Sequence, residues 1–185
     1  MNAEGFRLPI THTTADGEEI TIRLILPSDS FAEMTALLHR SYKPLADMGL
    51  RFVATHQNET VTEERAMTHG LCLVAVSGER LIGTITVNYP GWTRGSAFYE
   101  RPEVAHFGQF AVLPEYQKYG LGTLLLTASE ALARIIGASE IALDTSEHAH
   151  HLLRYYENRG YRFVEYVQWN EVNYRSKTLS KRLVE

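Results

Sequence analysis

The chain has little cysteine and no excess of basic residues, and each shortage excludes a class of protein. Among 185 residues the only cysteine is Cys72, so an internal disulfide is impossible. The 18 Lys and Arg residues are outnumbered by 22 Asp and Glu residues, which gives a net charge of −4. Because nucleic-acid binding needs a basic surface to neutralise phosphates, we expect no nucleic-acid partner. Cys72 lies in the apolar run 71–76 and is expected to be a small buried side chain.

Long apolar runs and metal-ligand spacings are also missing. No run approaches the roughly 20 residues that cross a bilayer, and residues 1–19 lack the apolar core of a signal peptide. We therefore expect a cytoplasmic protein with no membrane partner. No Cys and His spacing is typical of zinc, and His148, His150 and His151 are too close on one helical turn to converge on an ion. The sequence predicts no metal site.

Length and composition favour one globular domain over residues 1–185, with its core at about 20–183. Hydrophobic periodicity predicts strands at 20–26, 71–76, 81–87, 104–112, 141–143, 161–167 and 172–179. It predicts helices at 31–38, 60–69, 121–136 and 149–159, with loops or broken helices at 42–59 and a loop at 88–101. Strands and helices are interspersed without strict alternation. This order predicts an α/β mixed sheet rather than a doubly wound one.

The segment 110–123 carries the most specific chemistry. A buried strand runs through a short turn into the predicted helix 121–136, and Gly120 and Gly122 lie where that helix begins. Helix N-termini have unsatisfied N–H groups that attract anions, and glycine lets an anion approach the backbone. We therefore predict an anion-binding turn from Gln117 to Thr123, to which Lys118 adds a positive charge. The alternative is that the two glycines only permit tight packing of helix on strand.

This segment resembles the acetyl-CoA-binding motif of the GNAT N-acetyltransferase superfamily. The family consensus Gln/Arg-x-x-Gly-x-Gly/Ala is matched by Gln117, Gly120 and Gly122. The segment 152–161 is similar to the family signature Leu-Tyr-x-x-x-Gly-Phe/Tyr, and the element order over 20–183 also fits. The resemblance implies a GNAT-like fold in which helices flank a central, mostly antiparallel sheet.

The resemblance also implies acetyl-CoA as co-substrate, without a metal. In GNAT proteins the pantetheine arm lies between two splayed strands and binds backbone groups like an added strand. Carried over, the residues that contact the arm are Phe110, Ala111 and Val112. The pyrophosphate is then expected on the backbone of Gln117, Lys118, Tyr119, Gly120, Leu121, Gly122 and Thr123.

Two catalytic residues follow from the resemblance. Tyr156 occupies the family's Tyr position, where its phenol could protonate the leaving thiolate; Tyr155 lies about 100° away around the helix. His106 stands where the family often has a carboxylate base, and strand alternation places it on the face of Phe110 and Val112. The alternatives are that Tyr156 is a core residue, that His106 is structural, and that the nearby Glu103 is the base.

The implied activity is transfer of acetyl from acetyl-CoA to a primary amine of a small molecule or peptide, by direct attack in a ternary complex. Segments 42–52 and 89–99 and the surroundings of Trp169 are rich in aromatic residues. They predict either an aromatic amine pocket or packing of loops and subunits. One rival function is a non-catalytic acyl-CoA sensor or structural protein on the same fold, and another is a nucleotide-binding module. GNAT proteins are often dimers, so a homodimer is expected by analogy.

Overall fold

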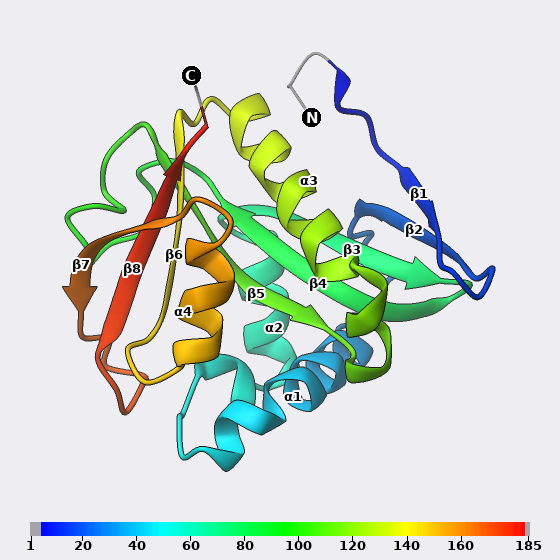
Figure 1. Cartoon of the computed structure of the whole chain (residues 1–185), viewed down its shortest axis with the longest axis horizontal. Coiled ribbons are helices and arrows are strands. Elements are labelled where there is room, and N and C mark those ends of the chain that lie inside the picture. The colour runs from blue at the N-terminus through cyan, green and yellow to red at the C-terminus, as the bar shows by residue number, and fades with distance from the viewer. Residues whose placement is uncertain (1–4, 184–185) are drawn as a thin grey trace.

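A computed structural model describes residues 5–183 and contains one eight-stranded mixed sheet (Figure 1). Its strand order is β1-β2-β3-β4-β5-β6-β8-β7, and every neighbouring pair is antiparallel except β5 with β6. The strands are β1 (Ile10–Thr13), β2 (Glu19–Leu24), β3 (Gly70–Ser77), β4 (Arg80–Asn88), β5 (Val104–Val112), β6 (Glu140–Ser146), β7 (Arg162–Val167) and β8 (Ser176–Arg182). The predicted mixed, mostly antiparallel sheet is confirmed.

Helices cover both faces of the sheet. They are α1 (Phe31–Asp47), α2 (Glu59–Met67), α3 (Leu121–Ile135) and α4 (His150–Glu157), with the short 3-10 helices η2 (Val53–Thr55) and η3 (Pro114–Tyr119). Figure 1 shows α3 in front of the strands and α2 behind them. The buried stripe of α3, which includes Leu121 and Leu125, packs across the middle of the sheet. Cys72 is buried in β3, as predicted.

Three local predictions were wrong. Helix α1 runs on to Asp47, where a loop or broken helices were expected, because Leu45 packs in a separate apolar cluster with Phe52 and Tyr174. Strand β1 was missed because its alternate residues are exposed and leave no apolar pattern. Strand β8 begins at Ser176, four residues after the predicted Val172. These boundaries depend on contacts that are distant in the sequence.

Strands β5 and β6 are paired over only three residue pairs. The last pair is His106 with Ala142, and beyond it the strands diverge (Figure 1). The opposite edge of β5 stays paired with β4 as far as Val112, and β6 stays paired with β8 as far as Ser146. The edge of β5 from Phe107 to Val112 is therefore open towards a gap.

A bulge at Gln109 changes which β5 side chains share a face. The register of β4 with β5 shifts between Thr84 and Thr86, and Gln109 has a φ of 47°. Phe110 consequently contacts Phe107, with ring centroids 6.0 Å apart, and lies on the side of α3. The prediction that His106 shares the face of Phe110 and Val112 was wrong, because simple alternation does not hold across a bulge.

Gly70 allows β3 to approach the end of β4 closely. A Cβ atom there would lie 2.1 Å from the Val87 carbonyl oxygen and 2.8 Å from Asn88 Cα, both of which are backbone atoms. We expect Gly70→Ala to lower the free energy of unfolding by about 3 kcal/mol, because backbone must move. Gly78→Ala is the control: Gly78 has a φ of 57° and no atom within 4 Å of its added Cβ, so its cost is about 1 kcal/mol. Urea unfolding followed by tryptophan fluorescence measures both, and equal losses would contradict the argument.

Candidate active site

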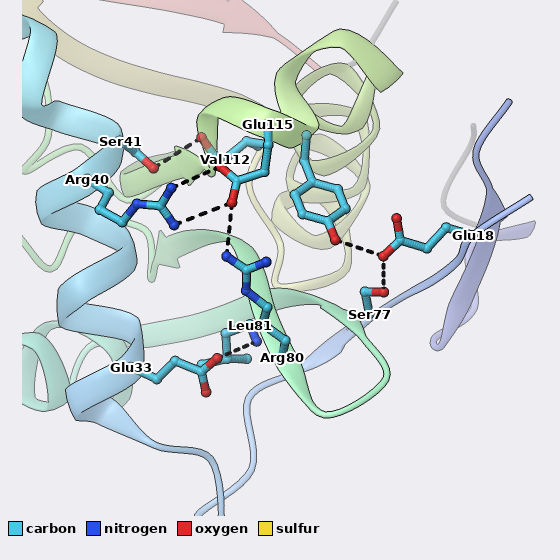
Figure 2. A network of polar contacts seen from close by, with 10 residues as sticks. Glu18, Glu33, Arg40, Ser41, Ser77, Arg80, Leu81, Val112 and Glu115 are labelled. Carbon is cyan, nitrogen blue, oxygen red and sulfur yellow. Dashed lines mark hydrogen bonds and ion pairs between the residues drawn. The ribbon is translucent and has the colours of Figure 1, made fainter. Parts of the chain in front are cut away.

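The turn that follows β5 is held in place from several sides (Figure 2). Glu115, at the start of η3, accepts from Arg40 of α1 (3.2 Å) and from Arg80 of β4 (2.9 Å). The Val112 carbonyl accepts from Ser41 Oγ at 3.1 Å and from Gln117 Nε2 at 3.0 Å. Exposed ion pairs add little stability, but here they restrict the position of the turn.

The turn has the geometry of an anion site. Gly120, with a φ of 73°, begins α3 in the left-handed conformation, and no side chain caps the helix. The first N–H groups of α3 therefore have no acceptor within the helix. The space beside Gly120 is open, with no atom within 4 Å of an added Cβ. The pyrophosphate site predicted on residues 117–123 remains a prediction, and these features fit it.

A second basic residue near this turn was missed by sequence reasoning. Arg159 follows α4, and its Nη2 donates to Thr123 Oγ1 at 2.9 Å. Its guanidinium stacks on the Tyr155 ring, 3.6 Å from the centroid, and the Tyr155 hydroxyl points towards Gly122. Arg159 directly precedes Gly160, which ends the predicted helix 149–159, so its position in the sequence indicated the end of a helix and no role at the turn.

A cleft of about 260 Å³ opens where β5 and β6 diverge, beside a second cavity of about 220 Å³ that shares part of its wall. Aromatic side chains from all three segments expected to form an amine pocket line the first cavity: Tyr42, Phe52, Tyr99 and Trp169. Tyr89 and Trp92 are exposed, and Trp92 stacks on His69 instead. The aromatic-pocket interpretation agrees with this placement better than loop packing alone.

Tyr156 lies in the wall of the cleft and is also part of the core. Its ring packs on Phe107 and Tyr161, with centroids 6.0 Å and 5.8 Å away. Its hydroxyl forms no hydrogen bond within residues 5–183, whereas of these two neighbouring tyrosines it is Tyr155 whose hydroxyl is fully buried without a partner. Burial raises the pKa of Tyr156 well above its ordinary value, so the phenol stays protonated. A protonated phenol without a partner can donate to a group in the cleft.

His106 also lines the cleft, but its ring is fully engaged. It stacks on Tyr99, with centroids 4.3 Å apart, and accepts from Asn88 Nδ2 at Nδ1 (3.2 Å). The other nitrogen, Nε2, is hydrogen-bonded to Thr93 Oγ1. Burial, and to a smaller degree the charge of Arg65, lowers the pKa of His106 to about 3. The imidazole is therefore neutral at physiological pH.

Three charged residues in the cleft were not singled out from the sequence, namely Arg65, Asp144 and the exposed Glu171. Asp144 on β6 accepts from Tyr99 Oη (3.2 Å) and Trp169 Nε1 (3.0 Å), and burial raises the pKa of its carboxyl group. Arg65 of α2 lines both cavities. Asp144 directly follows the apolar run 141–143, and a carboxylate at the end of a buried strand could have been recognised as a candidate site residue. Arg65 lies in a polar helix, where nothing in the sequence distinguishes it from its neighbours.

Glu103, the alternative base, lies outside both cavities. Its carboxylate accepts from Arg101, at 2.8 Å from Nε, and that bond lowers its pKa. Within residues 5–183 no three His, Cys, Asp or Glu side chains gather as a metal site would require. The helices in that range are all too short or too polar to cross a membrane.

Comparison with known proteins agrees with this geometry. The Acetyltransferase (GNAT) family matches residues 33–161. Two enzymes of Bacillus subtilis (strain 168) are similar in sequence. The S-(2-succino)cysteine N-acetyltransferase is 30% identical over 141 residues, which are 75% of this chain and 82% of that enzyme. The S-alkylcysteine N-acetyltransferase is 29% identical over 133 residues, 70% of this chain and 72% of that enzyme.

Solved structures share the fold at low identity. The GNAT domain of S. lividans PAT superposes with a TM-score of 0.70 at 17% identity, covering 96% of this chain and 99% of that one. A putative acetyltransferase from Salmonella typhimurium, solved with its cofactor acetyl-CoA, gives 0.65 at 16% identity, covering 90% of this chain and 95% of that one.

The state of His106 can be tested directly. Because its pKa is about 3, its ring resonances should not titrate between pH 5 and pH 8 in NMR spectra, with the assignment made by their loss in His106→Gln. In the unfolded chain the residue binds a proton near pH 6.5. Above about pH 6.5 neither state binds this proton, so the residue does not lower the free energy of unfolding. Between about pH 6.5 and pH 3 only the unfolded chain binds it, so the free energy of unfolding falls by up to about 1.4 kcal/mol per pH unit as the pH is lowered. A titration midpoint near 6.5 in the folded protein would contradict this environment.

Proposed function

Because the chain belongs to the GNAT acetyltransferase family, we propose that it transfers the acetyl group of acetyl-CoA to the amine of a small, S-substituted cysteine or a related amino acid. Support for the acceptor class comes from the two Bacillus subtilis relatives, whose names give cysteine derivatives as substrates. Acetyl-CoA supplies the activated acyl group as a thioester. The amine and the thioester must meet in one cleft for direct transfer.

The observation that carries the proposal is the open edge of β5, which joins the anion-binding turn to the aromatic cleft. Phe110 lies beside Gly122 at the turn, and Phe107 lies beside Tyr156 at the cleft. Backbone N–H and C=O groups on an open edge need partners. The Val112 carbonyl already accepts from Ser41 and Gln117. The amides of a pantetheine arm would pair with the remaining free backbone groups of Phe110, Ala111 and Val112, and its pyrophosphate would bind the N–H groups of residues 117–123.

Tyr156 is the proposed acid. Its hydroxyl stays protonated and lines the cleft, so it can donate to the thiolate that leaves when the new amide bond forms. A backbone N–H on the open edge of β5 would stabilise the oxyanion of the intermediate.

Two candidate acceptors of the amine proton, His106 and Asp144, line both cavities, whereas the carboxylate of Glu171 lines only the first and is exposed. To take a proton, the neutral His106 ring would have to give up its bond from Asn88, and its lowered pKa makes it a weak base. Asp144 is the stronger base, because burial raises the pKa of its carboxyl group and both of its donors are neutral. We therefore add Asp144 to the predicted His106.

The proposal is tested by titrating the protein with acetyl-CoA in a calorimeter, with ATP and NAD as controls, and by measuring thiol release with a panel of amines. We expect selective micromolar binding of acetyl-CoA and release only with an amine present. Gly122→Val should weaken acetyl-CoA binding by about 10-fold or more, because its methyl groups would press on Tyr155 and Phe110, which lie 3.5 Å and 3.7 Å from an added Cβ, and would displace the open edge of β5. Gly122→Ala is the control, since an added Cβ lies no closer than 3.5 Å to its neighbours.

Unchanged affinity in Gly122→Val would contradict the anion-binding turn. Binding of acetyl-CoA without release on any amine would favour the non-catalytic sensor. Preference for ATP or NAD would favour a nucleotide-binding module.

Tyr156→Phe tests the acid. We expect kcat to fall by about 10²-fold or more, as for loss of general acid catalysis, while the dissociation constant of acetyl-CoA changes little. Tyr166→Phe is the control, because it removes the hydroxyl of an exposed tyrosine that lines neither cavity. For both variants, steady-state kinetics measures kcat and calorimetry measures the dissociation constant of acetyl-CoA. Parallel loss of kcat and acetyl-CoA affinity in Tyr156→Phe would assign the residue to structure alone.

A further inference from the structure

The cleft contains one cation, Arg65, and two carboxylates, Asp144 and the exposed Glu171, and none of the three forms an ion pair within residues 5–183. Arg65 and Asp144 line both cavities, whereas Glu171 lines only the first. Unpaired charges in a partly buried site are costly, and proteins keep them mainly where a ligand completes the pair. Arg65 and Asp144 together match a ligand that carries both a negative and a positive charge.

We propose that Arg65 binds the carboxylate of the amino-acid acceptor while Asp144 faces its ammonium group, so that these two residues determine the choice of acceptor. This inference rests on the proposed acetyl transfer and names the part of the acceptor that the cleft recognises. It excludes simple alkylamines and polyamines as good substrates, because they leave Arg65 without a partner.

The surroundings of Arg65 fix its guanidinium group. Gln57 is buried, and its Oε1 accepts a hydrogen bond from Arg65 Nη1. The other end of that amide, Nε2, donates to Thr62 Oγ1 at 2.7 Å, and Thr62 Oγ1 donates to the Asn58 carbonyl at 3.0 Å. The amide of Gln57 is thus oriented by α2 itself, and it presents its oxygen to Arg65. A positioned guanidinium suits carboxylate recognition, because its N–H groups bind the two carboxylate oxygens in parallel.

Gly108 leaves room for the free side of this guanidinium. A Cβ atom on Gly108 would lie 3.6 Å from Arg65 Nη2, so this nitrogen extends over the backbone of β5. Nη2 has no hydrogen-bond partner among residues 5–183. It therefore remains available to a ligand that lies beside the open strand edge.

The hydrogen bonds to Asp144 come from neutral groups, and the charge of Arg65 lowers the pKa of its carboxyl group only in part against the larger effect of burial. Tyr99 and Trp169 donate to its two oxygens, which orients the carboxylate without neutralising it. It sits on β6, across the gap from β5. An amine placed between the two strands by a carboxylate on Arg65 would meet this carboxylate.

The test compares two acceptors that differ only in charge, S-methyl-L-cysteine and its carboxamide. For the unaltered protein we expect kcat/KM to be about 100-fold higher for the acid. Arg65→Gln should remove most of that preference, mainly through KM, and should leave the carboxamide rate and the acetyl-CoA affinity nearly unchanged. Arg65→Lys should restore part of the preference for the acid, because an ammonium group keeps the positive charge but lacks the parallel N–H donors of a guanidinium group. Arg51→Gln, at an exposed arginine outside both cavities, is the control.

A binding measurement separates this inference from the proposed function. Calorimetry with S-methyl-L-cysteine alone should show binding that Arg65→Gln abolishes, whether or not acetyl-CoA is turned over. If the acid binds in this way but no amine releases thiol, acetyl transfer fails and the carboxylate site stands. The inference is overturned if the acid neither binds nor reacts, or if kcat/KM is the same for the acid and the carboxamide. It is also overturned if Arg65→Gln lowers kcat/KM for both acceptors by the same factor.

Discussion

The early end of the pairing between β5 and β6 is the constraint on which the rest of the site depends. The two strands separate after His106 and Ala142, while each keeps its other neighbour. The bulge at Gln109 lies just beyond the separation, and its strained φ of 47° is held by a bond from Thr86 Oγ1 to the Gln109 side chain (3.2 Å). Local strain of this kind persists where surrounding contacts fix it. The separation from β6 leaves β5 with a free edge inside the protein, where backbone groups must find a partner.

The two ends of that edge are built differently. At the turn, side chains from three directions hold η3: Arg40 and Arg80 bind Glu115, and the Tyr116 hydroxyl donates to Glu18 at 2.7 Å. At the cleft, aromatic rings from loops, helices and β5 surround three charged residues, Arg65, Asp144 and Glu171. The turn is therefore held from several sides, as the proposed site for the pyrophosphate of acetyl-CoA requires. The cleft varies with its loops, which is where acceptor choice is expected to lie.

Local patterns in the sequence predicted the strand, turn and helix of 104–136 with little error, because periodicity and glycine placement act within one segment. Contacts between distant segments decided the rest. Helix α1 continues to Asp47 because of Phe52 and Tyr174, and the bulge at Gln109 reverses the expected face of His106. Tyr156 was found through a family signature, whereas Arg65 became visible only when the fold placed a polar helix beside β5.

The central claim is that acetyl-CoA binds along the open edge of β5 and over the start of α3. Hydrogen–deuterium exchange with and without acetyl-CoA tests it most directly, because the claim specifies which amides gain partners. The account predicts slower exchange at Phe110–Val112 and at Gln117–Thr123, with little change in β1 and β2. Protection confined to other segments, or none at saturating acetyl-CoA, would contradict it.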